Sequence, residues 1–191
     1  KLEEDPFTRD DARVRTLLAN LNGDVLDLGC GEGPYEALLG PLAREGRIRY
    51  VGVDPHAPLE TLAARWPWAT LIKGDAESAP LDKSFHHVLL LRSWNHLREP
   101  EKAIRRVVES LHPQGELLIV DNVAFGLART RAQTERAVRS TSNFEHYRND
   151  DAESAHQIVL GAADEKLTLE ERVDVGPGTA NQWLLRYRRV S

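Results

Sequence analysis

The stretch that decides the fold of this chain is VLDLGCGEG, residues 25–33. An apolar run leads directly into three alternate glycines, Gly29, Gly31 and Gly33, and a helix-like stretch follows them. Glycine is favoured where a backbone must turn sharply or let a ligand approach the main chain closely. We therefore expect a strand, a tight loop and a helix in this order, with a ligand held against the loop.

This loop differs from the two common phosphate-binding loops. Its glycines follow the spacing G-x-G-x-G rather than G-x-G-x-x-G, and Glu32 occupies the place where a pyrophosphate would lie. A carboxylate there repels phosphate and suits a cationic ligand. No Lys-Ser or Lys-Thr pair follows the glycines, which excludes the phosphate-cradling P-loop. An NAD-dependent oxidoreductase is therefore a disfavoured alternative.

Acidic residues also follow the next two apolar runs. The first run, RYVGVD at 49–54, ends in Asp54. In a strand-helix-strand unit, a carboxylate about 20 residues beyond the glycines lies beside a ribose. The second run leads into GDAE, residues 74–77. Several motifs in a fixed order are far more specific than one glycine loop.

With Asp27 ahead of the loop, these motifs resemble the class I S-adenosylmethionine-dependent methyltransferases, and in particular their small-molecule, type 11-like branch. The resemblance covers roughly residues 20–122. It includes PLDKSFHHV, residues 80–88, which is similar to the family's loop into its fourth strand. It implies S-adenosylmethionine as cofactor and S-adenosylhomocysteine as product. The scattered His and Asp residues form no metal-ligand pattern, so no metal is expected.

The resemblance also implies which residues hold the cofactor. Asp54 would accept from the ribose hydroxyls, Asp75 would accept from the adenine amino group, and Asp27 would organise the loop and the methionine ammonium. The full set is Asp27, Gly29, Cys30, Gly31, Gly33, Asp54, Pro55, Asp75, Ala76, Glu77, Arg92 and Trp94. Each of these residues could instead have a purely structural role. Cys30 could be a small buried residue, and a tryptophan that follows a strand, such as Trp94, is often part of the core.

Length and composition favour one domain spanning residues 1–191. The net charge of -5 argues against a broad nucleic-acid surface. No apolar run approaches the roughly 20 residues that span a bilayer. The single cysteine excludes an intramolecular disulfide and a cysteine-based zinc site. We therefore expect a soluble, cytoplasmic protein with no membrane contact. Monomer and homodimer are both open, and because the chain starts at Lys1 without methionine, we expect further residues ahead of it.

Hydrophobic periodicity predicts an α/β fold. By resemblance this is a Rossmann-like, doubly wound, mostly parallel sheet of seven strands, with an antiparallel last strand and helices on both faces. Predicted helices cover 7–21, 34–45, a short segment ending at Trp66, 99–112 and 151–163. Predicted strands cover 24–28, 48–53, 71–72, 88–91, 117–120, 167–175 and a segment around 183–185. A turn is expected at 112–115.

Residues 123–149 interrupt this alternation and are predicted to form a lid insertion after strand five. The segment is rich in Arg, Thr and Ser. An insertion there lies outside the carboxyl ends of the strands, where ligands bind in parallel sheets. The segment FEHYRN, 144–149, is read either as substrate-contacting or as an ordinary helix end. Candidate substrate-binding residues are Trp94, His96, Arg129, Phe144, His146, Tyr147 and Arg148, with His96 and His146 as candidate catalytic bases.

The predicted function is transfer of a methyl group to an oxygen, nitrogen or carbon of a small metabolite by in-line displacement. The lid arginines favour an anionic acceptor. A domain that binds the cofactor without transferring methyl, as a regulatory or partner protein, is the alternative from another class. Methylation of nucleic acid or protein is disfavoured by the net charge. It is also disfavoured because Arg92-Ser93-Trp94-Asn95 stands where such enzymes carry an Asn/Asp-Pro-Pro-Tyr/Phe motif.

Overall fold

The computed structural model of the protein describes residues 12–123, 148–176 and 181–191. The predicted lid therefore lies almost entirely outside the described residues, as does the start of the predicted first helix. Among the residues described, no helix has the length and apolar character needed to cross a membrane.

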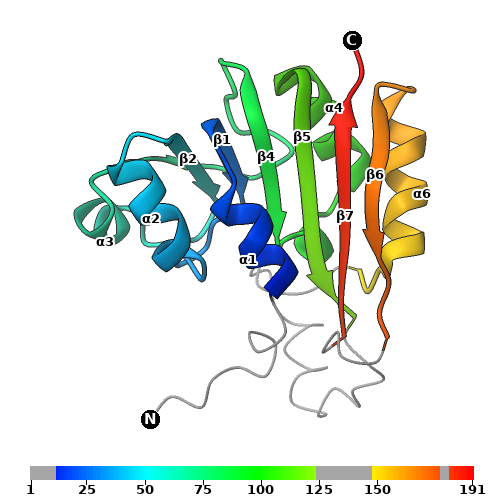
Figure 1. The fold of residues 1–191 in the computed structure, drawn as a ribbon, viewed down its shortest axis with the longest axis horizontal. Coiled ribbons are helices and arrows are strands. Elements are labelled where there is room, and N and C mark those ends of the chain that lie inside the picture. Colours follow the sequence, from blue (N-terminus) through cyan, green and yellow to red (C-terminus); the bar gives the residue numbers. More distant parts are fainter. Residues whose placement is uncertain (1–11, 124–147, 177–180) are drawn as a thin grey trace.

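Seven strands form one sheet in the order β3-β2-β1-β4-β5-β7-β6. Six strands run parallel, and β7 alone runs antiparallel between β5 and β6, which confirms the predicted architecture. In Figure 1 the arrowheads of β4, β5 and β6 all point to the lower edge, and that of β7 points the other way. The strands are β1 (Gly23–Leu28), β2 (Ile48–Asp54), β3 (Ala69–Lys73), β4 (Phe85–Leu91), β5 (Leu111–Asn122), β6 (Leu167–Val173) and β7 (Gln182–Arg189).

Helices cover both faces of the sheet, as the continuous apolar strands require. In Figure 1, α1 and α2 lie in front of the sheet, while α4 and α6 lie behind it. Each face of the sheet has its own hydrophobic core, and successive residues of β4 alternate between them. Val88 and Leu90 pack with α4 and α6, and Leu89 and Leu91 pack with α1 and α2. The helices are α1 (Ala12–Ala19), α2 (Glu36–Arg44), α3 (Leu59–Arg65), the 3-10 turn η2 (Trp94–His96), α4 (Pro100–Ser110) and α6 (Ala152–Ala163).

Most predicted elements are present with shifted ends, and the prediction of a turn at 112–115 needs correction. These residues lie within the bounds of β5. The pairing with β4 jumps there from Phe85↔Leu111 to His87↔Glu116, so four residues of β5 lie opposite one residue of β4. Gln114 has a φ of +66°, in the left-handed region. The segment is a bulge inside a strand rather than a loop between elements.

Candidate functional site

A cleft of about 630 Å³ opens at the carboxyl ends of the parallel strands. The chain runs outward through β1, β2 and β3 and then returns to β4 on the other side of β1. Ligands of open parallel sheets bind at this reversal of strand order. The predicted cofactor residues that line the cleft are Gly29, Gly31, Asp54, Pro55, Asp75, Ala76, Glu77 and Arg92, and the predicted base His96 joins them. The remaining four predicted cofactor residues lie elsewhere.

The glycine loop follows β1 directly and packs tightly on one side only. Gly29 has a φ of +77°, and a Cβ added to it would lie 2.5 Å from the Cβ of Ser93. The amide of Gly29 donates to the carbonyl of Val53 at 2.7 Å, which ties the loop to β2. Gly31 also has a positive φ, +53°, but no atom lies within 4 Å of its Cβ position. The main chain is therefore exposed to the cleft at Gly31, and any side chain there would project into open space.

Asp54 organises this loop from the end of β2. One carboxylate oxygen, Oδ2, accepts from the Gly31 amide at 3.0 Å. The other, Oδ1, accepts from the amides of His56 and Ala57 at 2.8 and 2.7 Å. A carboxylate offers about four acceptor positions. Asp54 can therefore accept a further donor from the cleft while keeping the loop in place.

The loop after β3 presents Asp75, Ala76 and Glu77 to the cleft. Asp75 Oδ1 accepts from the Ser78 hydroxyl at 2.6 Å. Glu77 Oε1 accepts from two amides ahead of α4, those of Arg98 at 3.1 Å and Glu99 at 3.2 Å. The carboxylate of Glu77 thus holds the segment ahead of α4 against this loop. Asp75 is exposed, so its carboxylate can accept a hydrogen bond from a ligand in the cleft.

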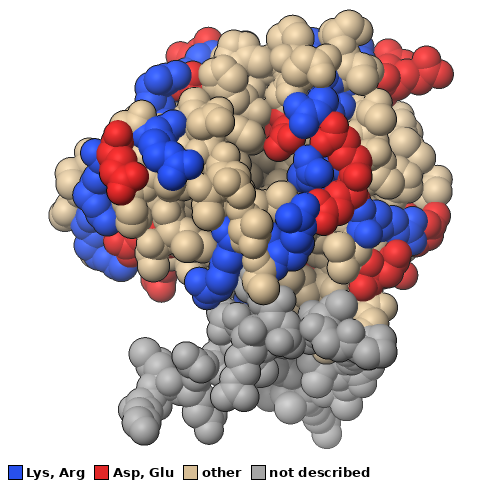
Figure 2. All heavy atoms as spheres, in the orientation of Figure 1, with Lys and Arg blue, Asp and Glu red and all other residues tan. Residues whose placement is uncertain are grey.

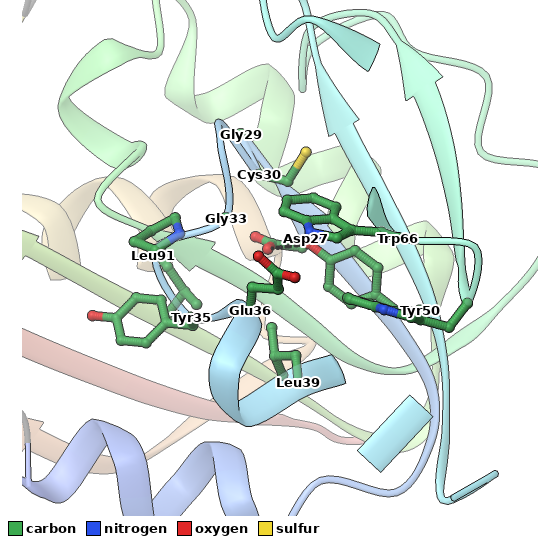
Figure 3. Close-up of a pocket in the computed structure, with 12 residues that line it drawn as sticks. Asp27, Gly29, Cys30, Gly33, Tyr35, Glu36, Leu39, Tyr50, Trp66 and Leu91 are labelled. Carbon is green, nitrogen blue, oxygen red and sulfur yellow. Dashed lines mark hydrogen bonds between the residues drawn. The ribbon is translucent and has the colours of Figure 1, made fainter. Parts of the chain in front are cut away.

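Asp27 lies behind the glycine loop rather than in the cleft. It lines a second, small compartment with Tyr50, Trp66 and Leu91, and Figure 3 shows its carboxylate beside Tyr50 and Trp66. The Tyr50 hydroxyl donates to Asp27 Oδ2 at 2.6 Å. Burial raises the pKa of Asp27 to about 6, the hydrogen bond from Tyr50 opposes this, and the charge of Asp54 adds to it. Gly29 lines both the cleft and this small compartment, so it lies between the two.

Cys30 and Gly33 also face this rear compartment. Burial raises the pKa of the Cys30 thiol, with the charges of Asp27 and Asp54 adding to the effect, so the side chain stays a protonated, inert thiol at neutral pH. Gly33 has a φ of +78°, and a Cβ there would lie 2.1 Å from the ring of Trp66. Both residues shape the loop from behind.

Trp94 belongs to the core, and the expectation that it contacts cofactor or substrate is not met. Its side chain is fully buried, and its indole nitrogen donates to Asp150 Oδ2 at 2.9 Å. Arg92 and His96 lie on either side of it in the chain and do line the cleft. Arg92 has a φ of +59°, which is uncommon outside glycine and sharply turns the chain after β4. This turn directs Arg92 toward the cleft while Trp94 points inward.

Three buried polar residues that the sequence did not single out hold η2 in place: Asn95, Asp121 and Asp150. The Asn95 amide donates to Asp121 Oδ2, and the Asp150 amide donates to Asn95 Oδ1, both at 2.9 Å. Burial raises the pKa of Asp121, and its two backbone hydrogen bonds oppose the shift. The partners lie 26 and 55 residues apart in sequence, so no local pattern could have revealed them.

Arg148, a predicted substrate-binding residue, forms an ion pair with a member of this buried group. Its Nε lies 2.6 Å from Asp150 Oδ2, and its amide donates to the carbonyl of Asn95 at 3.3 Å. Arg148 is therefore tied to η2. The other predicted residues of this segment, Arg129, Phe144, His146 and Tyr147, lie outside the described residues.

At the opposite edge of the sheet, Asp24, His86 and His112 bring potential metal-ligand atoms within 4.8 Å of one another. This group could not be predicted from local sequence patterns, because it depends on the bulge in β5, which brings the His112 ring beside that of His86. The carboxylate of Asp24 is already held by Arg49 at 2.7 Å and Lys83 at 3.2 Å. His86 Nδ1 accepts from the Asp24 amide at 2.9 Å. The carboxylate of Asp24 and Nδ1 of His86 are thus already engaged with other groups.

Comparison with known proteins gives consistent results. A family described as a methyltransferase domain matches residues 26–119. An uncharacterized methyltransferase of Mycobacterium tuberculosis is 39% identical over 100 residues, which cover 51% of this chain and 39% of that protein. An uncharacterized methyltransferase of Mycobacterium bovis matches to the same extent. The match thus spans well under half the length of these curated relatives.

Solved structures share the fold at low identity. The N-methyltransferase NodS of Bradyrhizobium japonicum, in complex with S-adenosylhomocysteine, has a TM-score of 0.68 and 20% identity, covering 100% of this chain and 91% of that one. The 1,6-didemethyltoxoflavin N1-methyltransferase of Burkholderia thailandensis has a TM-score of 0.68 and 20% identity over 99% of this chain and 80% of that one. The [4+2]-cyclase SpnF has a TM-score of 0.66 and 20% identity, covering 93% and 80%. Over residues 26–119 the chain thus matches a methyltransferase-domain family, and its sheet has the fold of these solved structures.

Proposed function

We propose that this protein transfers a methyl group from S-adenosylmethionine to a small-molecule acceptor. The observation that carries the proposal is the cleft itself, in which the exposed main chain at Gly31 lies with Asp54 and Asp75 beside Arg92 and His96. These groups come from the carboxyl ends of four neighbouring strands. Acceptors for hydroxyl and amino groups therefore line one side of the cleft, and a cation and an imidazole line the other.

The described residues fit the cofactor. The Cβ position of Gly31 meets no protein atom, so the loop is a cradle that a side chain would fill. Asp54 would accept from the ribose hydroxyls, Asp75 would accept from the adenine amino group, and Ala76 would supply main-chain contacts. Gly29 and Gly31 would lie against the methionine end.

The protein's main contribution to the reaction is positioning. When bound, S-adenosylmethionine supplies a methyl group on a positively charged sulfur, and that sulfur keeps the electron pair of the broken bond when the acceptor attacks. Holding the acceptor in line at attack distance can lower a barrier by about 7–11 kcal/mol, whereas a general base contributes about 10² to 10⁴-fold. The cleft walls, rather than one reactive side chain, would therefore set most of the rate.

His96 is the described candidate for removing a proton from the acceptor. It lines the cleft, and an imidazole within reach of the acceptor can serve as a general base. Its charge interacts with the buried Asp121, which would stabilise the protonated imidazole once the proton is taken. His146 stays a second candidate, outside the described residues.

We further propose a single domain over residues 1–191 in which 123–149 forms a lid over the acceptor. Within 125–150 there are five arginines, at 129, 131, 136, 139 and 148, and three acids, at 135, 145 and 150, a difference of +2 in a chain of net charge -5. This supports an anionic acceptor. The Burkholderia neighbour holds a small heterocycle, 1,6-didemethyltoxoflavin, which supports a small-molecule acceptor and a place in small-molecule metabolism.

Two features bear on the partners. On the face shown in Figure 2, basic and acidic side chains of the described residues are interspersed, and no continuous basic stripe forms. This supports an acceptor other than nucleic acid. The lone cysteine supports a cytoplasmic location.

A second function is kept because the [4+2]-cyclase SpnF shares this fold. A cleft of this kind can serve a chain that binds the cofactor without transferring its methyl group, as a regulatory or partner domain. Such a chain would bind cofactor and release no methylated product.

The first experiment is calorimetric binding of S-adenosylmethionine and S-adenosylhomocysteine to the wild type, to Asp54→Ala and to Asp82→Asn. Asp82 is exposed and does not line the cleft, so its variant controls for loss of a carboxylate. We expect binding to the wild type and Asp82→Asn and loss of binding in Asp54→Ala. No binding to the wild type would overturn the cofactor assignment. Transfer of radiolabelled methyl to a panel of small anionic metabolites then separates the enzyme from the non-catalytic alternative.

A further inference from the structure

Three residues that line the compartment behind the glycine loop each carry a buried polar atom without a hydrogen-bond partner. The atoms are Asp27 Oδ1, Trp66 Nε1 and Trp68 Nε1. All three residues line the same small cavity, which also touches Gly33 and Tyr50. The two indole rings stack with their centroids 5.7 Å apart, and the edge of Tyr50 packs against Trp68 at 5.4 Å. Buried polar groups are nearly always hydrogen-bonded, so three unpartnered polar atoms on residues that line one cavity point to a ligand.

The chemistry of the three atoms restricts that ligand. Two indole N–H groups can only donate, and a carboxylate oxygen can only accept. A cation would meet two donors, and an anion would meet the carboxylate of Asp27. The ligand must therefore accept two hydrogen bonds and donate at least one.

The size of the cavity narrows the choice to one small molecule. Its volume is about 10 Å³. That is close to the smallest volume that holds a water molecule, and a buried water typically makes about three hydrogen bonds. Two indole donors and one carboxylate acceptor supply this number.

We propose that a single internal water molecule binds between Asp27, Trp66 and Trp68 and forms a polar link behind the glycine loop. The water accepts from both indoles and donates to Asp27 Oδ1, while Tyr50 donates to the other oxygen of the same carboxylate. The link reaches both ends of the loop, because Asp27 precedes it and Trp66 contacts the position of Gly33. The inference concerns the fold behind the loop and does not depend on methyl transfer.

The charged surroundings of Asp27 are consistent with this role for water. Two residues of β2 act on the carboxylate of Asp27: Tyr50 donates a hydrogen bond to it, and the charge of Asp54 repels it. Cys30 of the glycine loop and Glu36 of α2 also line the cavity. Burial raises the pKa of Asp27, and no described basic side chain lines the cavity to oppose this. A donating water supplies a second hydrogen bond to the ionised carboxylate in addition to that of Tyr50.

The test is water-to-indole magnetisation transfer by NMR on the wild-type chain. The four tryptophans give four indole N–H signals, which through-bond experiments assign without any variant. We expect cross-peaks from a long-lived water to the Trp66 and Trp68 indoles. The Trp94 and Trp183 indoles are internal controls, because they donate to Asp150 at 2.9 Å and should give no such cross-peaks.

Two results would overturn the proposal. The first is the absence of water cross-peaks to either indole, or their presence at only one of them. The second concerns Tyr50, whose hydroxyl could pass magnetisation from solvent by proton exchange. If the cross-peaks vanish in folded Tyr50→Phe, the hydroxyl and not a bound water is their source. Persistence of both cross-peaks in Tyr50→Phe supports the water.

Discussion

The hydroxyl of Tyr50 donates a 2.6 Å hydrogen bond to the carboxylate of Asp27, across the parallel pair formed by β1 and β2. The acidic residue of the glycine motif is thus held from behind by a neighbouring strand, while its own loop faces the cleft. The bond favours the ionised carboxylate, and burial opposes ionisation. The balance makes Asp27 a source of pH-dependent stability.

We predict that Asp27 makes the free energy of unfolding fall as pH rises from about 4 to about 6. Its pKa is 3.8 when unfolded and about 6 when folded, so in this range the folded chain keeps a proton that the unfolded chain has lost. The contribution is complete below pH 4 and is lost above pH 6, with a size on the order of 3 kcal/mol. Urea denaturation across this range should show the fall in the wild type and in Asp82→Asn, and a flatter profile in Asp27→Asn. Parallel profiles for Asp27→Asn and wild type would contradict it.

Replacing Tyr50 by phenylalanine should raise the pKa of Asp27 further. A hydrogen bond to a charged group contributes about 1.5–3 kcal/mol, and the loss applies only where Asp27 is ionised. We expect Tyr50→Phe to lower the free energy of unfolding more at pH 8 than at pH 4. NMR titration of the Asp27 carboxyl carbon gives the midpoint directly. An unchanged midpoint would show that the hydrogen bond does not stabilise the charge.

Gly33→Ala should destabilise the fold strongly. Its Cβ would lie 2.1 Å from the Trp66 ring, and its φ of +78° disfavours any side chain. Overpacking costs about 1–3 kcal/mol, and the left-handed conformation costs about 1–2 kcal/mol more. The matched control is Gly161→Ala in α6, where no atom lies within 4 Å of the Cβ position and alanine should stabilise the helix by about 0.5–1 kcal/mol. Chemical denaturation gives the free energy of unfolding of both variants. Equal changes in the two variants would contradict the tight packing of Gly33 against Trp66.

Gly31→Ala should separate cofactor binding from folding. The position meets no neighbouring atom, so only the φ of +53° costs stability, on the order of 1–2 kcal/mol. The added methyl would nevertheless occupy the cleft against which the ligand lies. We expect affinity for S-adenosylhomocysteine to drop by about tenfold or more while the chain stays folded, with calorimetry and denaturation as the two readouts. Unchanged affinity in the folded variant would place the cofactor away from Gly31.

Asn95→Ala should destabilise the fold around η2. The substitution leaves the buried amide of Asp150 without its 2.9 Å acceptor, and an unsatisfied buried group costs about 1–3 kcal/mol. The exposed Asn20 serves as control, because its alanine variant should change stability by about 0.5 kcal/mol or less. Thermal or urea unfolding of both variants gives the comparison. A cost for Asn95→Ala no larger than that for Asn20→Ala would remove the structural role assigned to Asn95.

The order of the strands and the glycine loop could be predicted because their signals are local. Alternating runs and the glycines of 29–33 lie within a few residues of one another. Asn95, by contrast, depends on Asp150, which is 55 residues away. For the same reason, no local pattern predicts the cross-strand ion pairs that Arg186 and Arg188 form with Glu116 and acids of β6. Trp94 was ambiguous, since whether it faces the core or the cleft depends on the turn at Arg92.

The place of β7 in the sheet has a consequence for how the chain is completed during synthesis. β6 joins the sheet only by pairing with β7, and β7 also closes the edge of β5. Because β7 follows β6 in the chain, the nascent protein exposes the edge of β5 and an unpaired β6 until β7 has left the ribosome. Unpaired edges promote association with other chains. In the interval before β7 emerges, these two edges need protection from aggregation.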